Sequence, residues 1–201
     1  MSGTVLLSTA YLPPLEYFSA IASSDGVKIE VEETYHKQTF RNRCYIQSAH
    51  GIQILTVPVF EGSFRRTALK DIRIDYSKRW QQVHLRALEA AYRGTPYYEF
   101  YIDGISGILL MRPEFLTELN NLLLKLIIGD LGLVRNIEVT DHFEPIIGSS
   151  MDLRYSITPK KESNYIPKKY RQTNKSDGTI SSRLSILDLL FNMGPESVAF
   201  L

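Results

Sequence analysis

The sequence has one cysteine, almost no net charge and no long apolar run. A single cysteine, Cys44, among 201 residues excludes an intramolecular disulfide, and with it the small disulfide-stabilised secreted scaffolds. A formal net charge of +1 lacks the basic excess of nucleic-acid-binding proteins, so we expect no nucleic acid as the main partner. The most apolar segment, 122–128, is far shorter than the ~20 residues of a membrane span, and the run at 5–7 is too short for a signal peptide. We therefore expect a cytoplasmic protein without a membrane span.

Several sequence patterns of cofactor and metal sites are also missing. Neither a G-x-G-x-x-G turn nor a P-loop occurs, so no nucleotide cofactor is predicted from a glycine-rich loop. No group of histidine, cysteine or carboxylate residues has the spacing of a zinc site, so no metal is implied. We therefore predict a protein without a cofactor.

The beginning of the chain predicts a βαβ unit. Residues 4–9 form a short run rich in Val and Leu, and residues 15–26 repeat apolar side chains at helical spacing after Pro14, which suits a first helical position. Residues 27–33 alternate apolar and charged side chains, which predicts a strand with its charges outward. Two strands joined by one helix normally pair in parallel.

The rest of the chain predicts a hairpin followed by a helical half. Residues 41–49 and 52–60 are strand-like and flank His50-Gly51, which is typical of a β-hairpin, and further strands are expected at 69–76 and 136–144. Apolar spacing predicts four more helices, at 77–94 with Ser77 as the cap, 96–110, 112–132 and 184–194. The fold class is therefore α/β, with a mixed sheet opened by the βαβ unit and the hairpin.

Residues 159–178 differ in composition from the rest of the chain. They hold two prolines and six Lys or Arg residues against Glu162 and Asp177, a local balance of +4. This composition predicts a mobile basic loop, which either closes over a bound molecule or is simply solvated. Because only the short helix at 184–194 follows and must dock on the core, we expect a single domain over 1–201.

The stretch 35–51, YHKQTFRNRCYIQSAHG, concentrates the polar candidates. If it is extended from Arg41, then Arg41 and Arg43 point to one face, while Asn42 and Cys44 point to the other. Two adjacent guanidinium groups need an anion, either a ligand phosphate or carboxylate or a carboxylate of the protein. The internal alternatives are Glu30, Glu32, Glu33, Asp71 and Asp75.

Cys44 and His84 are the candidate catalytic residues. Cys44 shares a face with Ile46, which favours a buried thiol, and as a nucleophile it would need His36 or His84 within reach. His84 follows Trp80 by four residues on the apolar stripe of a helix. It is either a core histidine bonded to a backbone carbonyl or a general base.

Four blocks of the sequence resemble the WbqC-like protein family, in the expected order and over almost the whole chain. They are LPPLEYFSAIASSDGVKIEVEETYHKQTFRNRCYI, LTVPV, IDYSKRWQQVHLRALEAAYRGTPYYEFY and LSILDLLFNMGP. Proteins of this family occur in bacterial gene clusters for O-antigen and related surface polysaccharides. The family pattern commonly has a glutamine-proline pair at the first strand-to-helix turn, where this chain reads Thr9-Ala10-Tyr11.

The resemblance implies a transferase that moves an acyl or aminoacyl (glycyl) group onto a nucleotide-linked amino sugar. A small-molecule substrate of this kind carries phosphates, which Arg41, Arg43 and Lys37 could hold, with Asn42 beside them. Tyr11 lies where ligands bind in parallel α/β sheets, beyond the end of the first strand. Tyr11, Tyr35 and Trp80 could stack on the sugar or the base, and His84 could take the proton of the acceptor amine. The alternatives are a nucleotidyltransferase-like enzyme, suggested by the βαβ unit, and a non-catalytic binding or scaffold protein of the same pathway.

Overall fold

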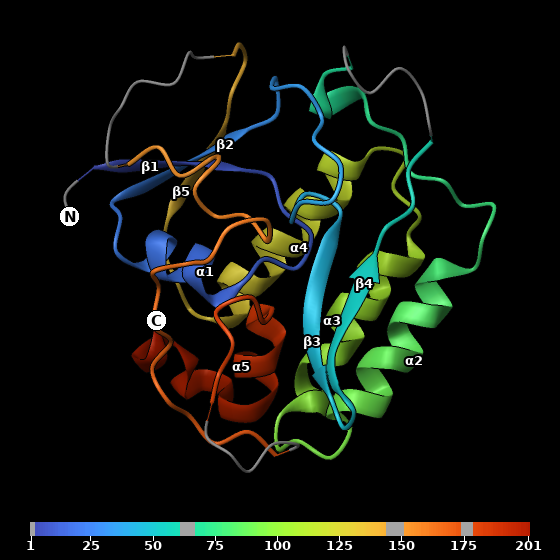
Figure 1. Cartoon of the computed structure of the whole chain (residues 1–201), viewed down its shortest axis with the longest axis vertical. Coiled ribbons are helices and arrows are strands. Elements are labelled where there is room, and N and C mark those ends of the chain that lie inside the picture. Colours follow the sequence, from blue (N-terminus) through green and yellow to red (C-terminus); the bar gives the residue numbers. More distant parts are fainter. Residues whose placement is uncertain (1–2, 61–66, 144–150, 174–178) are drawn as a thin grey trace.

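The computed structural model describes residues 3–60, 67–143, 151–173 and 179–201, and its fold is α/β (Figure 1). Its described strands form two sheets. The first is parallel, with the order β1-β2-β5, and the second is the antiparallel pair β3-β4. The predicted fold class is confirmed, with the parallel and antiparallel strands in separate sheets.

The predicted βαβ unit is present at the start of the chain. Strand β1 (Thr4–Ser8) leads into α1 (Leu15–Ala22) and then into β2 (Gly26–Glu30), which pairs in parallel with β1. Strand β5 (Asn136–Val139) pairs in parallel with the other edge of β2. The carboxyl ends of all three strands therefore meet at one edge of the sheet.

The charged side chains of β2 and the residues after it do not all face outward, which corrects the prediction for 27–33. The strand ends at Glu30, whose side chain is buried, and Glu33 is buried as well. Both carboxylates are bonded to arginines that come from outside the strand. The alternation of apolar residues correctly located the strand but not the partners that cover its second face.

The hairpin consists of β3 (Arg43–Ser48) and β4 (Gly51–Thr56) in antiparallel pairing. Ser48 pairs with Gly51, so Ala49 and His50 form a two-residue turn. The strand β3 begins at Arg43, two residues later than predicted. Its core side chains include Cys44 and Ile46, as expected for that face.

The strand expected at 69–76 is absent. A short 3-10 helix, Leu69–Asp71, occupies the first part, and Arg73 and Ile74 form only isolated bridges. Ile72 and Ile74 are nevertheless buried. The apolar alternation in this segment reflects which side chains are buried. The segment packs between the hairpin and the start of α4, but it has no continuous strand partner.

The helical half contains α2 (Trp80–Tyr92), α3 (Tyr98–Leu110), α4 (Leu116–Asp130) and α5 (Ile186–Met193). Helix α2 begins later than predicted, at a position where no side chain caps it, so Ser77 is not its cap. Val83, expected on the buried stripe, is 59% exposed. Ser185 does cap α5, since its hydroxyl accepts a bond from the amide of Leu187.

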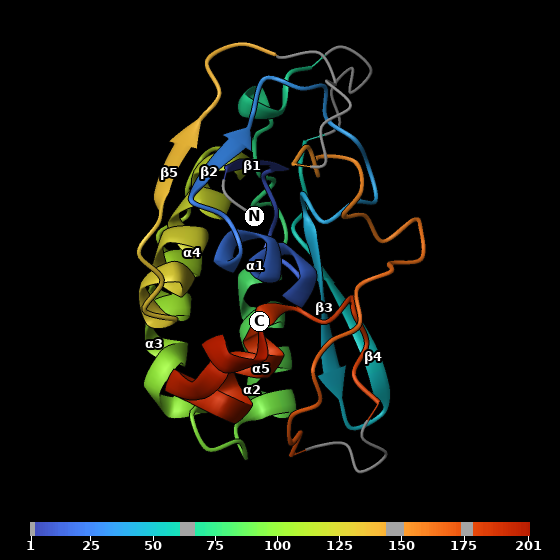
Figure 2. The same cartoon turned by 90° about the vertical axis from the view of Figure 1, so that its left-hand side faces the viewer.

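The helices and the C-terminal segment pack against one another beneath the parallel sheet in the view of Figure 2. Helix α3 contacts both α2 and α4, and α5 contacts α1, α3 and β3. The chain then ends in a 3-10 helix, Gly194–Phe200. No helix of the described ranges is long and apolar enough to span a bilayer.

The described part of the predicted basic loop, 159–173, contains no helix or strand; residues 174–178 lie outside the described ranges. Tyr170 and Gln172 both donate hydrogen bonds to the Asp188 carboxylate in α5. Ser163 donates to Glu16 in α1. These contacts connect the segment to the helices of the core.

Candidate functional site

Arg41 lies immediately before β3, and its guanidinium group is buried against a carboxylate. Nη2 of Arg41 is 2.7 Å from Oε1 of Glu33, and the two side chains are 5% and 0% exposed. The same Nη2 donates to Oγ of Ser8, at the end of β1. Arg41 therefore has an internal anion, which was the alternative to a ligand. Because Arg41 precedes the strand, it does not share a strand face with Arg43, and that expectation is corrected.

A second buried arginine, Arg154, lies at the same end of the sheet and was not identified from the sequence. Its Nη1 donates to Oε2 of Glu30 and its Nη2 to Oδ2 of Asp152, both at 2.7 Å. These bonds from Arg154 hold the pKa of Asp152 below its usual value. Backbone hydrogen bonds between Leu6 and the segment at 151–153 hold Arg154 beside β1. The available signal was a glutamate inside an apolar strand, because a buried carboxylate requires a cationic partner.

Arg43 lines a cavity, the Arg43 pocket, that has a volume of about 260 Å³. This pocket lies where β3 begins and β4 ends, and the segment after β2 closes one side of it. Four of the predicted substrate-binding residues share its lining: Tyr35, Lys37, Asn42 and Arg43. Gln38 and residues 56–59 complete the lining.

Two polar atoms of the Arg43 pocket lining are buried and have no hydrogen-bond partner among the described residues. Nδ2 of Asn42 donates to the carbonyl of Val57 at 2.9 Å, which fixes the orientation of the amide and leaves Oδ1 as an acceptor. The neighbouring atom is Nε of Arg43, a donor. Leaving such groups unsatisfied costs about 1–3 kcal/mol each. A ligand that offers an anionic oxygen and a hydroxyl or N–H group would satisfy both.

The charged side chains that line the Arg43 pocket, Lys37 and Arg43, are both cationic. None of the ion pairs between described residues involves Arg43, and the exposed Lys37 adds a second cationic side chain. Burial raises the pKa of Tyr35 to about 12, although the charges of Arg43 and Arg41 act in the opposite direction. The Tyr35 hydroxyl is therefore protonated at neutral pH. These groups together favour a negatively charged ligand.

Tyr11, Trp80 and His84 form a buried aromatic cluster that does not line the Arg43 pocket. Nδ1 of His84 is 2.9 Å from the hydroxyl of Tyr11, and the Trp80 ring packs edge-on at 5.0 Å from the His84 ring. Burial lowers the pKa of His84 to about 4, while a hydrogen bond to the backbone of Thr56 acts against this shift. His84 is therefore neutral at pH 7 and lies behind Thr56, which lines the pocket.

Cys44 is 1% exposed and lies in the core beneath the hairpin. Burial raises the pKa of its thiol far above the usual value. A thiol in such surroundings is not a thiolate at neutral pH, and the thiolate is the nucleophilic form. Its environment is that of a structural cysteine.

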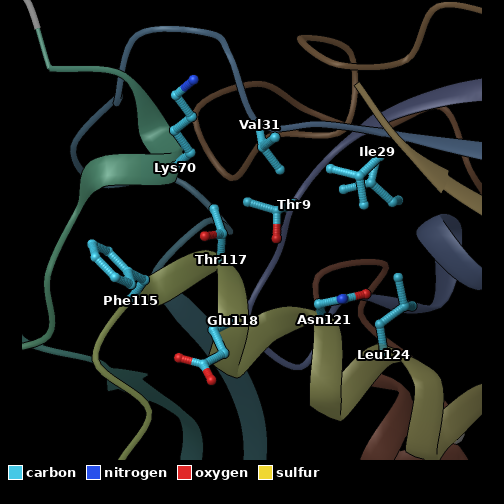
Figure 3. Close-up of a pocket in the computed structure, with 10 residues that line it drawn as sticks. Thr9, Ile29, Val31, Lys70, Phe115, Thr117, Glu118, Asn121 and Leu124 are labelled. Carbon is cyan, nitrogen blue, oxygen red and sulfur yellow. The ribbon is translucent and has the colours of Figure 1, made fainter. Parts of the chain in front are cut away.

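A larger cavity, the sheet-edge pocket, lies at the carboxyl ends of the three parallel strands (Figure 3). Its volume is about 540 Å³. The lining combines the ends of the strands with the first turns of α4 and the short helix at 69–71: Thr9, Ile29, Val31, Lys70, Phe115, Thr117, Glu118, Asn121, Leu124 and Val139. The sequence predicted a ligand site at this edge with Tyr11 in it, but Thr9 lines the cavity and Tyr11 does not.

Neither cavity contains a cluster suited to a metal ion. Within the described ranges, no group of three or more His, Cys, Asp and Glu side chains is arranged to hold one.

The amino-acid sequence was compared with those of known proteins and protein families. The chain is 28% identical to the uncharacterized protein Rv1507c of Mycobacterium tuberculosis (strain ATCC 25618 / H37Rv), in an alignment that covers 100% of this chain and 98% of that protein. No solved structure matches significantly. The model of the WbqC-like protein family matches residues 9–168, which include the lining of both pockets. The chain belongs to the WbqC-like protein family.

Proposed function

We propose that the protein is a transferase of bacterial surface-polysaccharide biosynthesis that moves an acyl or aminoacyl (glycyl) group onto a nucleotide-linked amino sugar. The observation that carries the proposal is the pair of unpartnered buried atoms in the Arg43 pocket, Nε of Arg43 and Oδ1 of Asn42. They match a substrate that presents an anionic oxygen close to a hydroxyl or N–H group.

The anionic group of this substrate is a phosphate or carboxylate bound by Arg43 and Lys37. A guanidinium group offers several donors in one plane and suits both anions, whereas an ammonium group contributes a point charge. Arg41 is not part of this site, because its charge is already neutralised by Glu33. The sequence-based set of Arg41, Arg43 and Lys37 is thus reduced to Arg43 and Lys37.

The size of the pocket limits which part of the substrate it holds. A volume of about 260 Å³ is below the ~300–1,000 Å³ of pockets that enclose a complete drug-sized ligand. The Arg43 pocket therefore receives an anionic group with the atoms attached to it, and the rest of a nucleotide-linked sugar extends outside.

The reaction forms a C–N bond between the acceptor amine and the carbonyl carbon of the donor. The bond from that carbon to the leaving group breaks, the leaving group departs with the electron pair, and the proton that the amine loses passes to solvent water. His84 has the neutral charge state of a base, but it lies behind Thr56. We assign it the role of a positioning residue that holds the wall of the pocket, and we assign Cys44 to the core.

The proposal is tested by incubating the purified protein with a panel of nucleotide-linked amino sugars and acyl or aminoacyl donors. Mass spectrometry should detect the transferred group on the sugar with the wild type, and not with Arg43→Gln. The matched control is Arg93→Gln, which removes an exposed arginine that pairs with Glu89 on α2. Absence of any product across the panel, or equal product formation by Arg43→Gln, would contradict the proposal and favour a scaffold role.

A further inference from the structure

The sheet-edge pocket has the size and place of a small-molecule site, and it is separate from the Arg43 pocket. The two cavities have no lining residue in common. A volume of about 540 Å³ is within the ~300–1,000 Å³ range of ligand pockets. Ligands of parallel α/β sheets bind outside the carboxyl ends of the strands, and this cavity lies at the ends of β1, β2 and β5.

Two apolar walls face each other across this cavity. Ile29 and Val31 extend from the end of β2 on one side, and Leu124 rises from α4 on the other (Figure 3). Phe115 and Val139 add apolar surface to the lining. A flat group with two apolar faces fits between such walls, whereas a saturated sugar ring has polar substituents all around its edge.

Uncharged polar groups lie between the walls. The hydroxyl of Thr9 points toward α4, where Thr117 and Asn121 stand on consecutive turns (Figure 3). The side-chain amide of Asn121 can both donate and accept, and so can the two hydroxyl groups. These three groups can therefore form hydrogen bonds with the edge of a ligand on which donors and acceptors alternate.

The charged residues at the rim do not provide a charge for the interior. The ammonium of Lys70 is 2.8 Å from Oε2 of Glu32, so its charge is already paired. The carboxylate of Glu118 points away from Thr9 (Figure 3). The interior thus suits an uncharged ligand.

We propose that the sheet-edge pocket binds an uncharged planar heterocycle of the kind that nucleosides carry. Tyr11 and Trp80, two of the three aromatic residues expected to stack on the sugar or the base, are buried in the core and cannot do so. The facing walls at the sheet edge provide the apolar surfaces instead. This inference does not depend on the anion site at Arg43.

The test is titration of the uniformly 15N-labelled full chain with adenosine, guanosine, cytidine, uridine and thymidine, followed by NMR. At least one nucleoside should shift the backbone amide signals of Thr9, Thr117 and Asn121 in a saturable way. Methyl β-D-ribofuranoside, which has the sugar but no base, should not. The inference is overturned if none of the five nucleosides shifts these signals, or if the riboside shifts them equally.

Three variants of α4 separate this pocket from the rest of the helix. Asn121→Trp fills the cavity and should weaken binding by at least about tenfold. Lys125→Trp, which introduces the same side chain at an exposed position of the same helix, should leave it unchanged. Asn121→Ala keeps the fold with a smaller change and should weaken binding about fivefold, the loss of one hydrogen bond. Unaltered affinity in both Asn121 variants would rule out this site.

Discussion

Arg41 and Glu33 form an ion pair in the interior, with Nη2 and Oε1 2.7 Å apart, whereas Arg43, two residues later, has a buried Nε without a partner. From the sequence alone the two arginines are equivalent, because their positions are two residues apart, which is one period of a β-strand. The ion pair with Glu33 connects Arg41, which precedes β3, to the residues that follow β2. Arg43 lines a cavity instead, and this difference is the basis of the function proposed above.

Arg41→Ala should destabilise the protein strongly, because it leaves the carboxylate of Glu33 buried without its cation. Breaking a buried pair in this way costs about 3–5 kcal/mol of the free energy of unfolding. Urea denaturation measures the loss. The matched control is Lys70→Ala, which breaks the exposed pair with Glu32 and should destabilise the protein far less than Arg41→Ala, because solvent screens an exposed ion pair. Equal losses in the two variants would show that the Arg41 pair does not hold the fold.

His84 should make the protein less stable in acid. Its pKa is lowered from 6.5 to about 4 in the folded state, so between these values the unfolded chain binds a proton that the folded chain does not. The contribution of His84 to the free energy of unfolding is fully present above the pKa of the unfolded state. It is lost as the pH drops toward 4, and the loss from this group is about 3 kcal/mol.

The measurement is the free energy of unfolding of wild type and His84→Gln at about pH 7 and about pH 4.5. The variant should lose less stability between the two pH values than the wild type. His50→Gln, at the exposed turn of the hairpin, should behave like the wild type. An unchanged pH dependence in His84→Gln would show that another group controls acid stability.

Gly194→Ala should destabilise the end of α5. Gly194 has φ +54°, and a Cβ atom there would lie 2.5 Å from Cδ1 of Tyr97, so both the backbone and the ring oppose the side chain. The cost should exceed about 1 kcal/mol, measured as a fall in Tm. Gly129→Ala is the contrasting variant, because a Cβ there meets nothing within 4 Å and α4 gains a better helix former. A fall in Tm for Gly129→Ala as large as that for Gly194→Ala would contradict this explanation.

Cys44 should be inert in the folded protein. Burial both raises the pKa of the thiol and excludes a reagent, so a thiol-specific reagent should label it only after denaturation. Labelling kinetics followed with and without urea test this expectation. Rapid labelling of the native protein would place the thiol at an accessible site and restore its candidacy as a nucleophile.

Much of the fold follows from short-range patterns. A short apolar run located β1, two-residue alternation located β2, strand-like runs on either side of a turn located β3 and β4, and apolar spacing located the helices. Each signal reflects the local geometry of one element. The C-terminal helix, predicted at 184–194, is observed at Ile186–Met193.

Errors arose where long-range partners decide the outcome. Glu30 resembles an outward-facing strand residue until Arg154, 124 positions away, covers it. The alternation at 72–74 produced burial without a continuous strand, because only isolated bridges form there. Ser77 could cap a helix, but α2 begins three residues later, at Trp80.

The candidate site was predictable in part. The stretch 35–43 was recognised as polar and basic, and four of its predicted residues do line one cavity. The sequence could not divide the arginines between an internal and an external anion, because that depends on where Glu33 is buried. The sheet-edge pocket has no local signal, since its lining comes from strand ends and a helix distant in sequence.

The most direct test of the central claim is calorimetric titration of the full chain with inorganic diphosphate, comparing wild type, Arg43→Gln and Arg93→Gln. Hydrogen bonds to charged groups contribute about 1.5–3 kcal/mol, so Arg43→Gln should bind at least about tenfold more weakly. Wild type and Arg93→Gln should bind alike, because Arg93 directly follows α2 and is not part of the pocket lining. Circular dichroism checks that each variant is folded. Binding by Arg43→Gln as tight as that of the wild type, or no binding by the wild type, would contradict the assignment of Arg43 to an anionic ligand.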